Sequence, residues 1–241
     1  MFISNQEAIP VIETDIFEKN KGNPLAIARV RTEDVLSGDN PVALGYSQLR
    51  ANVYIDQTGM LDSSYRREDG GEDDVDDGRS IHFVGLEDRG NGTAAVTAAM
   101  RLIYKSFEHS EALPIEELFA KELEGTSAPS GSFEVSRYIS KNENRRHAIL
   151  SKLAIIGSGL AHAVEHQWGP CFAVVEPPIE SDLDRLGVPV VRIAEPRYIP
   201  EYNDINVGIE INLTEHTRRL GARVVKSLYI EDDAVRFFGG E

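Results

Sequence analysis

Three acidic residues at an E-x-D-x-x-D spacing are the most informative chemical pattern in the sequence. Glu72, Asp74 and Asp77 occur in the run GGEDDVDDGRSIHFVG, directly ahead of a strand-like segment. Carboxylates crowded on one loop repel each other, so a folded protein keeps them either as a solvated surface or as a site for positive charge. We expect a site for positive charge, on a loop that becomes ordered when a positively charged ligand binds.

A second group of reactive side chains lies in the segment FEVSRY. Glu134 and Ser136 are two positions apart and therefore share one face of a strand. On a regular strand Arg137 would point to the face opposite Glu134 and Ser136. A β-bulge at this point would bring all three side chains to one side. Arg50 and Arg101 add positive charge, and each can either hold a substrate carboxylate or pair with the acidic loop.

Hydrophobic periodicity predicts the elements that position these residues. PLAIARV predicts a strand, and the next segment, PVALGYSQLRANVYIDQTG, predicts a helix that stops at Gly59. In that helix Arg50 and Tyr54 are four residues apart and share one face. Two strands, SIHFVGL and TAAVTAAMRLIY, flank the turn GNG and predict a β-hairpin over residues 80–104.

The second half of the chain predicts a strand-helix-strand unit. PIEELFAKEL predicts a short helix, FEVSRYIS a strand, and the apolar residues recurring from Leu150 to Val164 a long helix that precedes the strand CFAVVE. Two more strands, VPVVRI and NVGIEINL, follow. This order predicts an α/β (α+β) fold with a mixed sheet flanked by helices. We expect residues 1–22 to be an irregular arm, residues 23–241 to be one domain, and the tail from Thr214 to be helical or mixed.

Composition limits the classes of partner. The 25 basic and 40 acidic residues give a formal charge of −15 at pH 7, which disfavours nucleic acid as a partner because a phosphate backbone needs clustered Lys and Arg. Cys171 is the only cysteine, so the chain forms no internal disulfide and fits a reducing, cytoplasmic setting. We expect no signal peptide, no segment near the roughly 20 apolar residues of a membrane helix, and no membrane partner. The oligomeric state is left open.

From about Leu49 to Leu213, the order of these motifs resembles the acyl-homoserine-lactone (autoinducer) synthase family, which shares the fold of the GCN5-related N-acyltransferases (GNAT). The resemblance rests on an arginine and an aromatic four residues apart, the E-x-D-x-x-D triplet, the arginine in MRLI, an E-x-S-R strand and an R-x-G-V-P stretch in DRLGVPVVRIAEP. Met60 stands where the family usually has a tryptophan. The resemblance implies a GNAT-like fold with a mostly antiparallel sheet.

The resemblance also implies a reaction in quorum-sensing signal synthesis. An acyl group would move from an acyl-carrier-protein thioester to the amine of S-adenosylmethionine (SAM) or a related amino acid, and lactone closure would then release methylthioadenosine. SAM and the acyl-phosphopantetheine or acyl-CoA donor are substrates, so we expect no cofactor and no metal. The implied catalytic residues are Glu134, as the base, with Ser136 and Glu72. The implied substrate-binding residues are Arg50, Tyr54, Asp74, Asp77, Arg101 and Arg137.

A basic helix start indicates where the donor binds. SKNENRRHAILSKL places Arg145, Arg146 and Lys152 where helix N–H groups and positive charge can meet a phosphopantetheine arm or an acidic carrier protein. The stretch lacks a glycine-rich pyrophosphate loop, which favours carrier protein over CoA as the donor. An exposed helix end that balances an acidic protein is an equally good interpretation of these residues.

Three alternatives remain open. The first is a CoA-dependent GNAT N-acyltransferase that acts on another amine. The second is a zinc peptidase, because His162, Glu165 and His166 form an H-x-x-E-H pattern on the long helix. The third is a ligand-binding protein that kept the fold and lost turnover.

Overall fold

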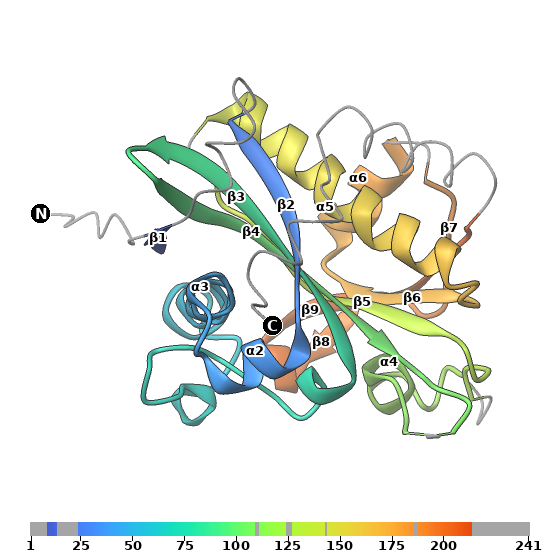
Figure 1. Ribbon diagram of the computed structural model, residues 1–241. Coiled ribbons are helices and arrows are strands. Elements are labelled where there is room, and N and C mark those ends of the chain that lie inside the picture. The colour runs from blue at the N-terminus through green and yellow to red at the C-terminus, as the bar shows by residue number, and fades with distance from the viewer. Residues whose placement is uncertain are drawn as a thin grey trace, which may run out of the picture.

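A nine-stranded sheet runs through the molecule and carries helices on both faces (Figure 1). The structure, a computed structural model, describes residues 9–13, 24–108, 111–123, 127–142, 144–185 and 188–213. The main strand order is β2-β3-β4-β5-β6-β9-β7, with β1 paired to β4 and β8 to β9. All pairs are antiparallel except β5 with β6. The expected fold class is confirmed, while the tail from Thr214 lies outside the described residues.

The strands and helices have the following bounds. The strands are β1 (Val11–Glu13), β2 (Leu25–Val30), β3 (Ser80–Gly90), β4 (Thr93–Tyr104), β5 (Phe133–Ser140), β6 (Cys171–Val175), β7 (Val190–Arg192), β8 (Arg197–Ile199) and β9 (Asp204–Ile211). The α-helices are α2 (Thr32–Ser37), α3 (Pro41–Ala51), α4 (Pro114–Leu118), α5 (Arg145–Glu165) and α6 (Pro177–Arg185). A π-helical turn, η1 (Asn52–Gln57), continues α3, and short 3₁₀ turns are η2 (Ser63–Tyr65), η3 (Asp77–Arg79) and η4 (Pro200–Tyr202).

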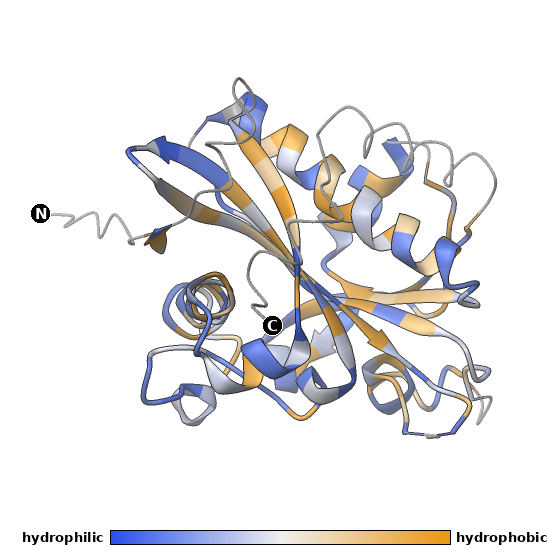
Figure 2. Ribbon diagram, in the orientation of Figure 1, coloured by the Kyte–Doolittle hydropathy of each residue, from blue (hydrophilic) through white to orange (hydrophobic). Residues whose placement is uncertain are grey.

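The helical layers bury different residues of the same strands. On one face, Tyr46 and Leu49 of α3 pack in a cluster with Val84 and Val96 of the hairpin. On the other face, α5 and α6 cover a second cluster that includes Met100. Figure 2 shows hydrophobic residues concentrated along the central strands between these layers. The alternation of strand side chains between two faces explains how one hairpin supplies both cores.

The β3–β4 hairpin is confirmed. Gly90, Asn91 and Gly92 have positive φ angles of 76°, 56° and 73°, which the glycines and the asparagine adopt at low cost. The strands that flank the turn cover residues 80–104 together.

Helix α5 is longer and more apolar than expected. Residues Arg146–Glu165 have the length and hydropathy of a membrane-spanning helix, contrary to the expectation that no segment approaches this limit. Half of the apolar window is buried inside the protein, against the sheet. Packing on the core therefore accounts for this composition, as it does for buried helices generally.

The predicted bulge is present in β5. Ala99 pairs with Ile139 and Arg101 pairs with Ser136, so β5 contains one more residue than the facing part of β4. Arg137 lies at this point with a φ of 51°, in the left-handed region that non-glycine residues rarely adopt. The bulge turns Arg137 toward the same side as Arg101 and Ser136.

Strands β5 and β6 separate at the same level. They pair in parallel only from Phe133 with Cys171 to Val135 with Ala173. Beyond that point β5 continues to Ser140 and β6 to Val175 without pairing to each other. The separation leaves room between the strands next to the bulge.

Part of the expected N-terminal arm belongs to the sheet. Residues 11–13 form β1, which pairs with Thr93–Ala95 of β4, and Val96 N donates to Pro10 O at 2.8 Å. The expectation of an irregular arm is wrong for these residues. Most of the remainder of residues 1–22 lies outside the described residues.

Candidate active site

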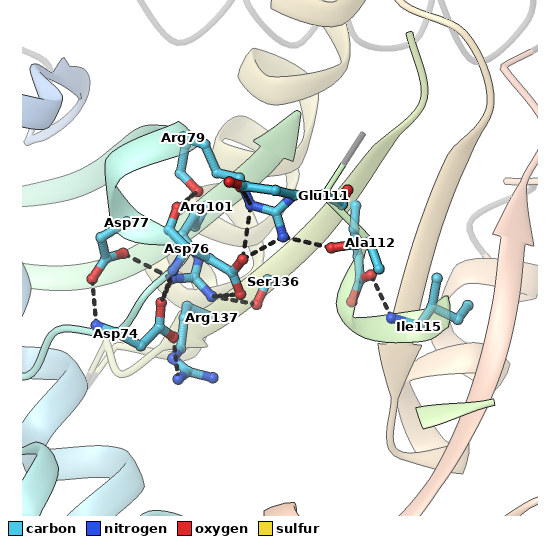
Figure 3. A network of polar contacts seen from close by, with 12 residues as sticks. Asp74, Asp76, Asp77, Arg79, Arg101, Glu111, Ala112, Ile115, Ser136 and Arg137 are labelled. Atoms are coloured by element: carbon cyan, nitrogen blue, oxygen red, sulfur yellow. Dashed lines mark hydrogen bonds and ion pairs between the residues drawn. The ribbon is translucent and has the colours of Figure 1, made fainter. Parts of the chain in front are cut away.

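Six charged side chains interlock beside the bulge in β5. We call them the ion-pair cluster: Arg50 of α3, Glu72, Asp74 and Asp77 of the acidic segment, Arg101 of β4 and Arg137 of β5. All six side chains are at most 10% exposed. Figure 3 shows Arg101 and Arg137 approaching Asp74 and Asp77 from the strands.

Asp77 lies at the centre of the ion-pair cluster. Arg50 donates to its two carboxylate oxygens at 2.9 and 3.0 Å, and Arg101 Nη1 donates to Oδ1 at 2.8 Å. Although burial alone would raise it, the pKa of Asp77 is held well below its usual range by Arg50 and Arg101. The carboxylate is therefore ionised throughout the physiological pH range.

Glu72 and Asp74 connect the cluster to β5. Arg137 Nη2 donates to Glu72 Oε1 at 3.1 Å and to Asp74 Oδ2 at 2.6 Å. Arg50 also donates to Glu72, and Arg101 to Asp74. Three guanidinium groups thus compensate three carboxylates, which corrects the expectation that the acidic loop orders only around a positively charged ligand.

A buried histidine and a buried tyrosine are hydrogen-bonded next to the ion-pair cluster. His82 Nε2 lies 3.2 Å from the backbone oxygen of Asp77, and Nδ1 lies 3.1 Å from the hydroxyl of Tyr46. A carbonyl only accepts, so Nε2 carries the proton and Nδ1 accepts from Tyr46. Burial lowers the pKa of His82 to about 4, which keeps the ring neutral.

A cavity of about 190 Å³ opens where β5 and β6 separate. Its walls are mainly apolar and include Met100, Leu102, Leu160, Leu183 and Ile211. Its polar lining residues are Tyr54, Thr58, Glu134, Ser136, Arg137, Tyr138, Glu176, Tyr202 and Asn206. An apolar cavity with a few polar groups is the usual form of a small-molecule site.

Glu134 is the most strongly perturbed acid that lines the cavity. The residue is 1% exposed, and its Oε2 accepts a hydrogen bond from Ile115 N at 2.9 Å. Burial raises the pKa of Glu134 to about 8, and the Ile115 N–H opposes this rise. A carboxyl group with this pKa can exchange a proton with an amine near neutral pH.

The predicted catalytic and substrate-binding residues divide into two sets. Tyr54, Glu134, Ser136 and Arg137 line the cavity. The others, Arg50, Glu72, Asp74, Asp77 and Arg101, belong to the ion-pair cluster and do not line the cavity. Glu72 is fully buried with both oxygens bound by arginines, so the geometry gives no support to its expected catalytic role.

Five polar residues that line the cavity were not predicted: Thr58, Tyr138, Glu176, Tyr202 and Asn206. Tyr202 and Asn206 come from the β8–β9 hairpin, and the Asn206 side chain is buried with an Nδ2 that lacks a hydrogen-bond partner within the described structure. Met60 and Thr58 also line the cavity, at the end of the π-helical turn. Neither hairpin residue lies in a recognisable motif, so only the topology reveals them.

The residues expected to meet the donor lie at the start of α5. Asn144 Oδ1 caps this helix by accepting from Arg146 N at 2.9 Å and from His147 N at 3.3 Å. The side chains of Arg146 and Lys152 are exposed, whereas that of Arg145 lies outside the described part of the chain. The basic helix start is therefore accessible but separate from the cavity lining.

The zinc-peptidase alternative receives no support from the described residues. His166 Nδ1 donates to the backbone oxygen of His162 at 2.9 Å, so this nitrogen is used within the helix end. In the part of the chain that the structure describes, no group of three His, Cys, Asp or Glu side chains is arranged to hold a metal.

Comparisons with known proteins agree on the fold. No protein-family profile and no curated protein sequence matches the chain. BjaI, a CoA-dependent acyl-homoserine lactone synthase solved with SAM and isopentyl-CoA, matches with a TM-score of 0.63 and 17% identity over 88% of this chain and 98% of that chain. The acyl-homoserine lactone synthase LasI matches with a TM-score of 0.61 and 17% identity, over 88% of this chain and 100% of that one. FeeM, an N-acyl amino acid synthase from uncultured soil microbes, matches with a TM-score of 0.52 and 11% identity, over 79% and 93%. The chain therefore has the GNAT-like acyltransferase fold.

Proposed function

We propose that this protein is an N-acyltransferase that moves an acyl group from a phosphopantetheine thioester to the α-amine of SAM or a related amino acid. One observation carries the proposal: Glu134, with a pKa raised to about 8 by burial, lines an apolar cavity beside Arg137 at the point where β5 and β6 separate. The apolar walls of the cavity suit an acyl chain, and the Glu134 carboxyl suits the amine of the acceptor.

The chemistry needs a neutral amine. The reference pKa of an α-amino group is about 7.7–8.0, so proton transfer to a carboxylate of similar pKa is close to balanced. The amine nitrogen attacks the thioester carbonyl carbon, the C–N bond forms, and the C–S bond breaks as the tetrahedral intermediate collapses. Glu134 gives the proton that it took from the ammonium group to the leaving thiolate. It then accepts the second proton, which the nitrogen loses as the amide forms, and releases it to solvent. We propose that Ser136, two residues along the same strand, faces the oxyanion of this intermediate.

Arg137 is the proposed partner of the acceptor carboxylate. Its bonds to Glu72 and Asp74 use Nε and Nη2, and among the described residues Nη1 makes no hydrogen bond. The Tyr54 ring lies under the guanidinium at 5.2 Å from its centroid and fixes its orientation. An α-amino acid would thus present its carboxylate to Arg137 and its amine to Glu134.

The same geometry serves more than one acceptor. SAM carries a sulfonium group, but the carboxylates that would attract it are already compensated by arginines. This favours a test with other amino acids beside SAM, as in an N-acyl amino acid synthase. With SAM as acceptor the product would be an acyl-homoserine lactone autoinducer, made in the cytoplasm.

The donor is proposed to be acyl carrier protein, with acyl-CoA as the alternative. Both carry the thioester on phosphopantetheine, so the cavity does not distinguish them. Exposed Arg146 and Lys152 on α5 offer positive charge to an acidic carrier protein. Arg146→Glu with Lys152→Glu should raise the KM for the acylated carrier protein and leave the KM for free acyl-pantetheine unchanged.

The deciding experiment is a transfer assay with mass-spectrometric detection. Purified protein is mixed with SAM or with single amino acids, and with hexanoyl carrier protein or hexanoyl-CoA. N-hexanoyl product, together with methylthioadenosine when SAM is present, supports the proposal, and Glu134→Gln should reduce kcat by about 10²–10⁴. No acylated product from any pair, in protein that binds acyl-pantetheine, would indicate a binding protein instead.

A further inference from the structure

The Glu134 carboxyl depends on a short helix for its only side-chain hydrogen bond within the described residues. Ile115, which donates to Oε2 at 2.9 Å, is the second residue of α4, and α4 has only five residues. A helix this short has little stability of its own. The position of the Ile115 N–H relative to Glu134 therefore depends on the contacts that hold α4. These are the buried packing of Ile115, the bonds of Glu116 to Lys105 Nζ and Ala128 N, and the contacts of the segment before α4.

Arg79 holds that segment. Its guanidinium donates to two successive backbone oxygens, that of Glu111 at 3.1 Å and that of Ala112 at 2.6 Å, immediately ahead of α4. Figure 3 shows Arg79 reaching from the turn after the acidic segment to these carbonyls, with Ile115 beyond them. A planar guanidinium that spans two acceptors fixes their orientation better than a single donor does.

Asp76 orients Arg79 in turn. Asp76 Oδ1 accepts from Arg79 Nε at 2.9 Å and from Nη2 at 2.5 Å, and both side chains are at most 20% exposed. Asp76 Oδ2 also lies 3.9 Å from Arg101 Nη2. The pair therefore connects the ion-pair cluster to the start of α4.

We propose that Arg79 is a positioning residue for Glu134, the acid that exchanges a proton with the acceptor amine. Arg79 holds the two carbonyls ahead of α4, and this contact and its positive charge together control the protonation of Glu134. The proposal deepens the proposed function and rests on Glu134 being the base. Arg79 does not line the cavity, so it acts on Glu134 through Ile115 and through its charge, and not by contact with the substrate.

The charges around Glu134 define the expected sign of each perturbation. The groups that interact with it are Asp76 and Arg79 near η3, Arg101 on β4, Cys171 on β6 and Tyr202 in η4. Asp76 raises the pKa of Glu134, whereas Ile115 N–H, Arg101 and Arg79 lower it. Removing Arg79 takes away its charge and loosens the Ile115 donor, and both effects raise the pKa.

The test is a titration of the Glu134 carboxyl in the intact protein. Infrared difference spectra between pH 5 and pH 10, with Glu134→Gln as the reference, report its ionisation without any turnover. Arg79→Met should shift the midpoint upward by about one pH unit, and Asp76→Asn, which keeps an oxygen for Arg79 but removes the charge, should shift it downward. Arg79→Lys keeps the charge and should give a smaller upward shift.

Arg192→Met is the matched control, because Arg192 pairs with Glu180 at the surface and lies away from Glu134. It should leave the midpoint unchanged, and the pH profile of kcat should follow the midpoint in every variant.

The deciding variants are Arg79→Lys and Asp76→Asn. Midpoints that stay within about 0.2 pH units of the wild-type value in both, or that move in the same direction in both, would overturn the proposal. If Arg79→Met fails to fold, these two variants still decide. Absence of acyl transfer by the wild type would refute the proposed function but leave this titration readable.

Discussion

Replacing Arg101 by Met tests whether the ion-pair cluster acts as a charge-compensated unit. Arg101 is 1% exposed and bonds to both Asp74 and Asp77, so its removal leaves one uncompensated negative charge in a buried site. Breaking a buried pair in this way typically costs about 3–5 kcal/mol of unfolding free energy. For a chain of this length the loss corresponds to a Tm lower by roughly 6–20 °C.

The assay is urea unfolding followed by circular dichroism at pH 7. The double variant Arg101→Met with Asp77→Asn removes one charge of each sign, so it should recover about 2 kcal/mol relative to the sum of the single variants. Arg192→Met, at an exposed pair, should cost less than about 1 kcal/mol. An Arg101→Met loss as small as that of Arg192→Met, or strict additivity in the double variant, would refute the reasoning.

Three further predictions concern the acid, the cavity and the helix that carries Arg50. The pKa of Glu134 is raised from a usual value near 4.5 to about 8, so its contribution to stability is complete at low pH and is lost as pH rises toward and through 8. The unfolding free energy should therefore fall by roughly 3–4 kcal/mol more between pH 5 and pH 8 in the wild type than in Glu134→Gln. Equal pH dependence of the unfolding free energy in the two proteins would contradict this. Leu160→Trp fills part of the apolar cavity and should raise the KM for long-chain donors at least about tenfold while leaving acetyl and butyryl donors little affected. A series of donors of increasing acyl length measures this effect, and Ile149→Trp, at an exposed position of the same helix, is the control. Asn40→Ala removes the side chain that caps α3 at Val42 N and should cost about 1 kcal/mol in thermal unfolding, with Asn40→Asp retaining the cap.

The sequence predicts the parts of this fold that depend on local pattern. The hairpin over residues 80–104, the strand with Glu134 and the long helix follow from alternation, helical spacing and the GNG turn, and all three are confirmed. The order and spacing of the motifs also predict that Arg50, Arg101 and the acidic triplet belong to one site. Whether those arginines bind substrate or carboxylates depends on distances across the fold, and the structure places them on the carboxylates.

The parts that could not be predicted depend on contacts between distant segments. Tyr202 and Asn206 reach the cavity only because β9 pairs with β6 next to the point where β5 separates. Arg79 appears in the sequence as one more basic residue after an acidic run. Its two carbonyl partners lie more than 30 positions further along the chain. Every residue type has a backbone oxygen, so the sequence does not show which residues accept these bonds.

The pairing of β1 with β4 bears on how the protein can be shortened. Strand β5 pairs with β4 only from Ala98 onward, and β1 covers Thr93–Ala95 on the same strand. A chain that began at residue 24 would bare these backbone groups next to Ala94 and Val96, which are fully buried. Open strand edges of this kind pair with other chains, so removing the N-terminal residues up to 23 should promote self-association.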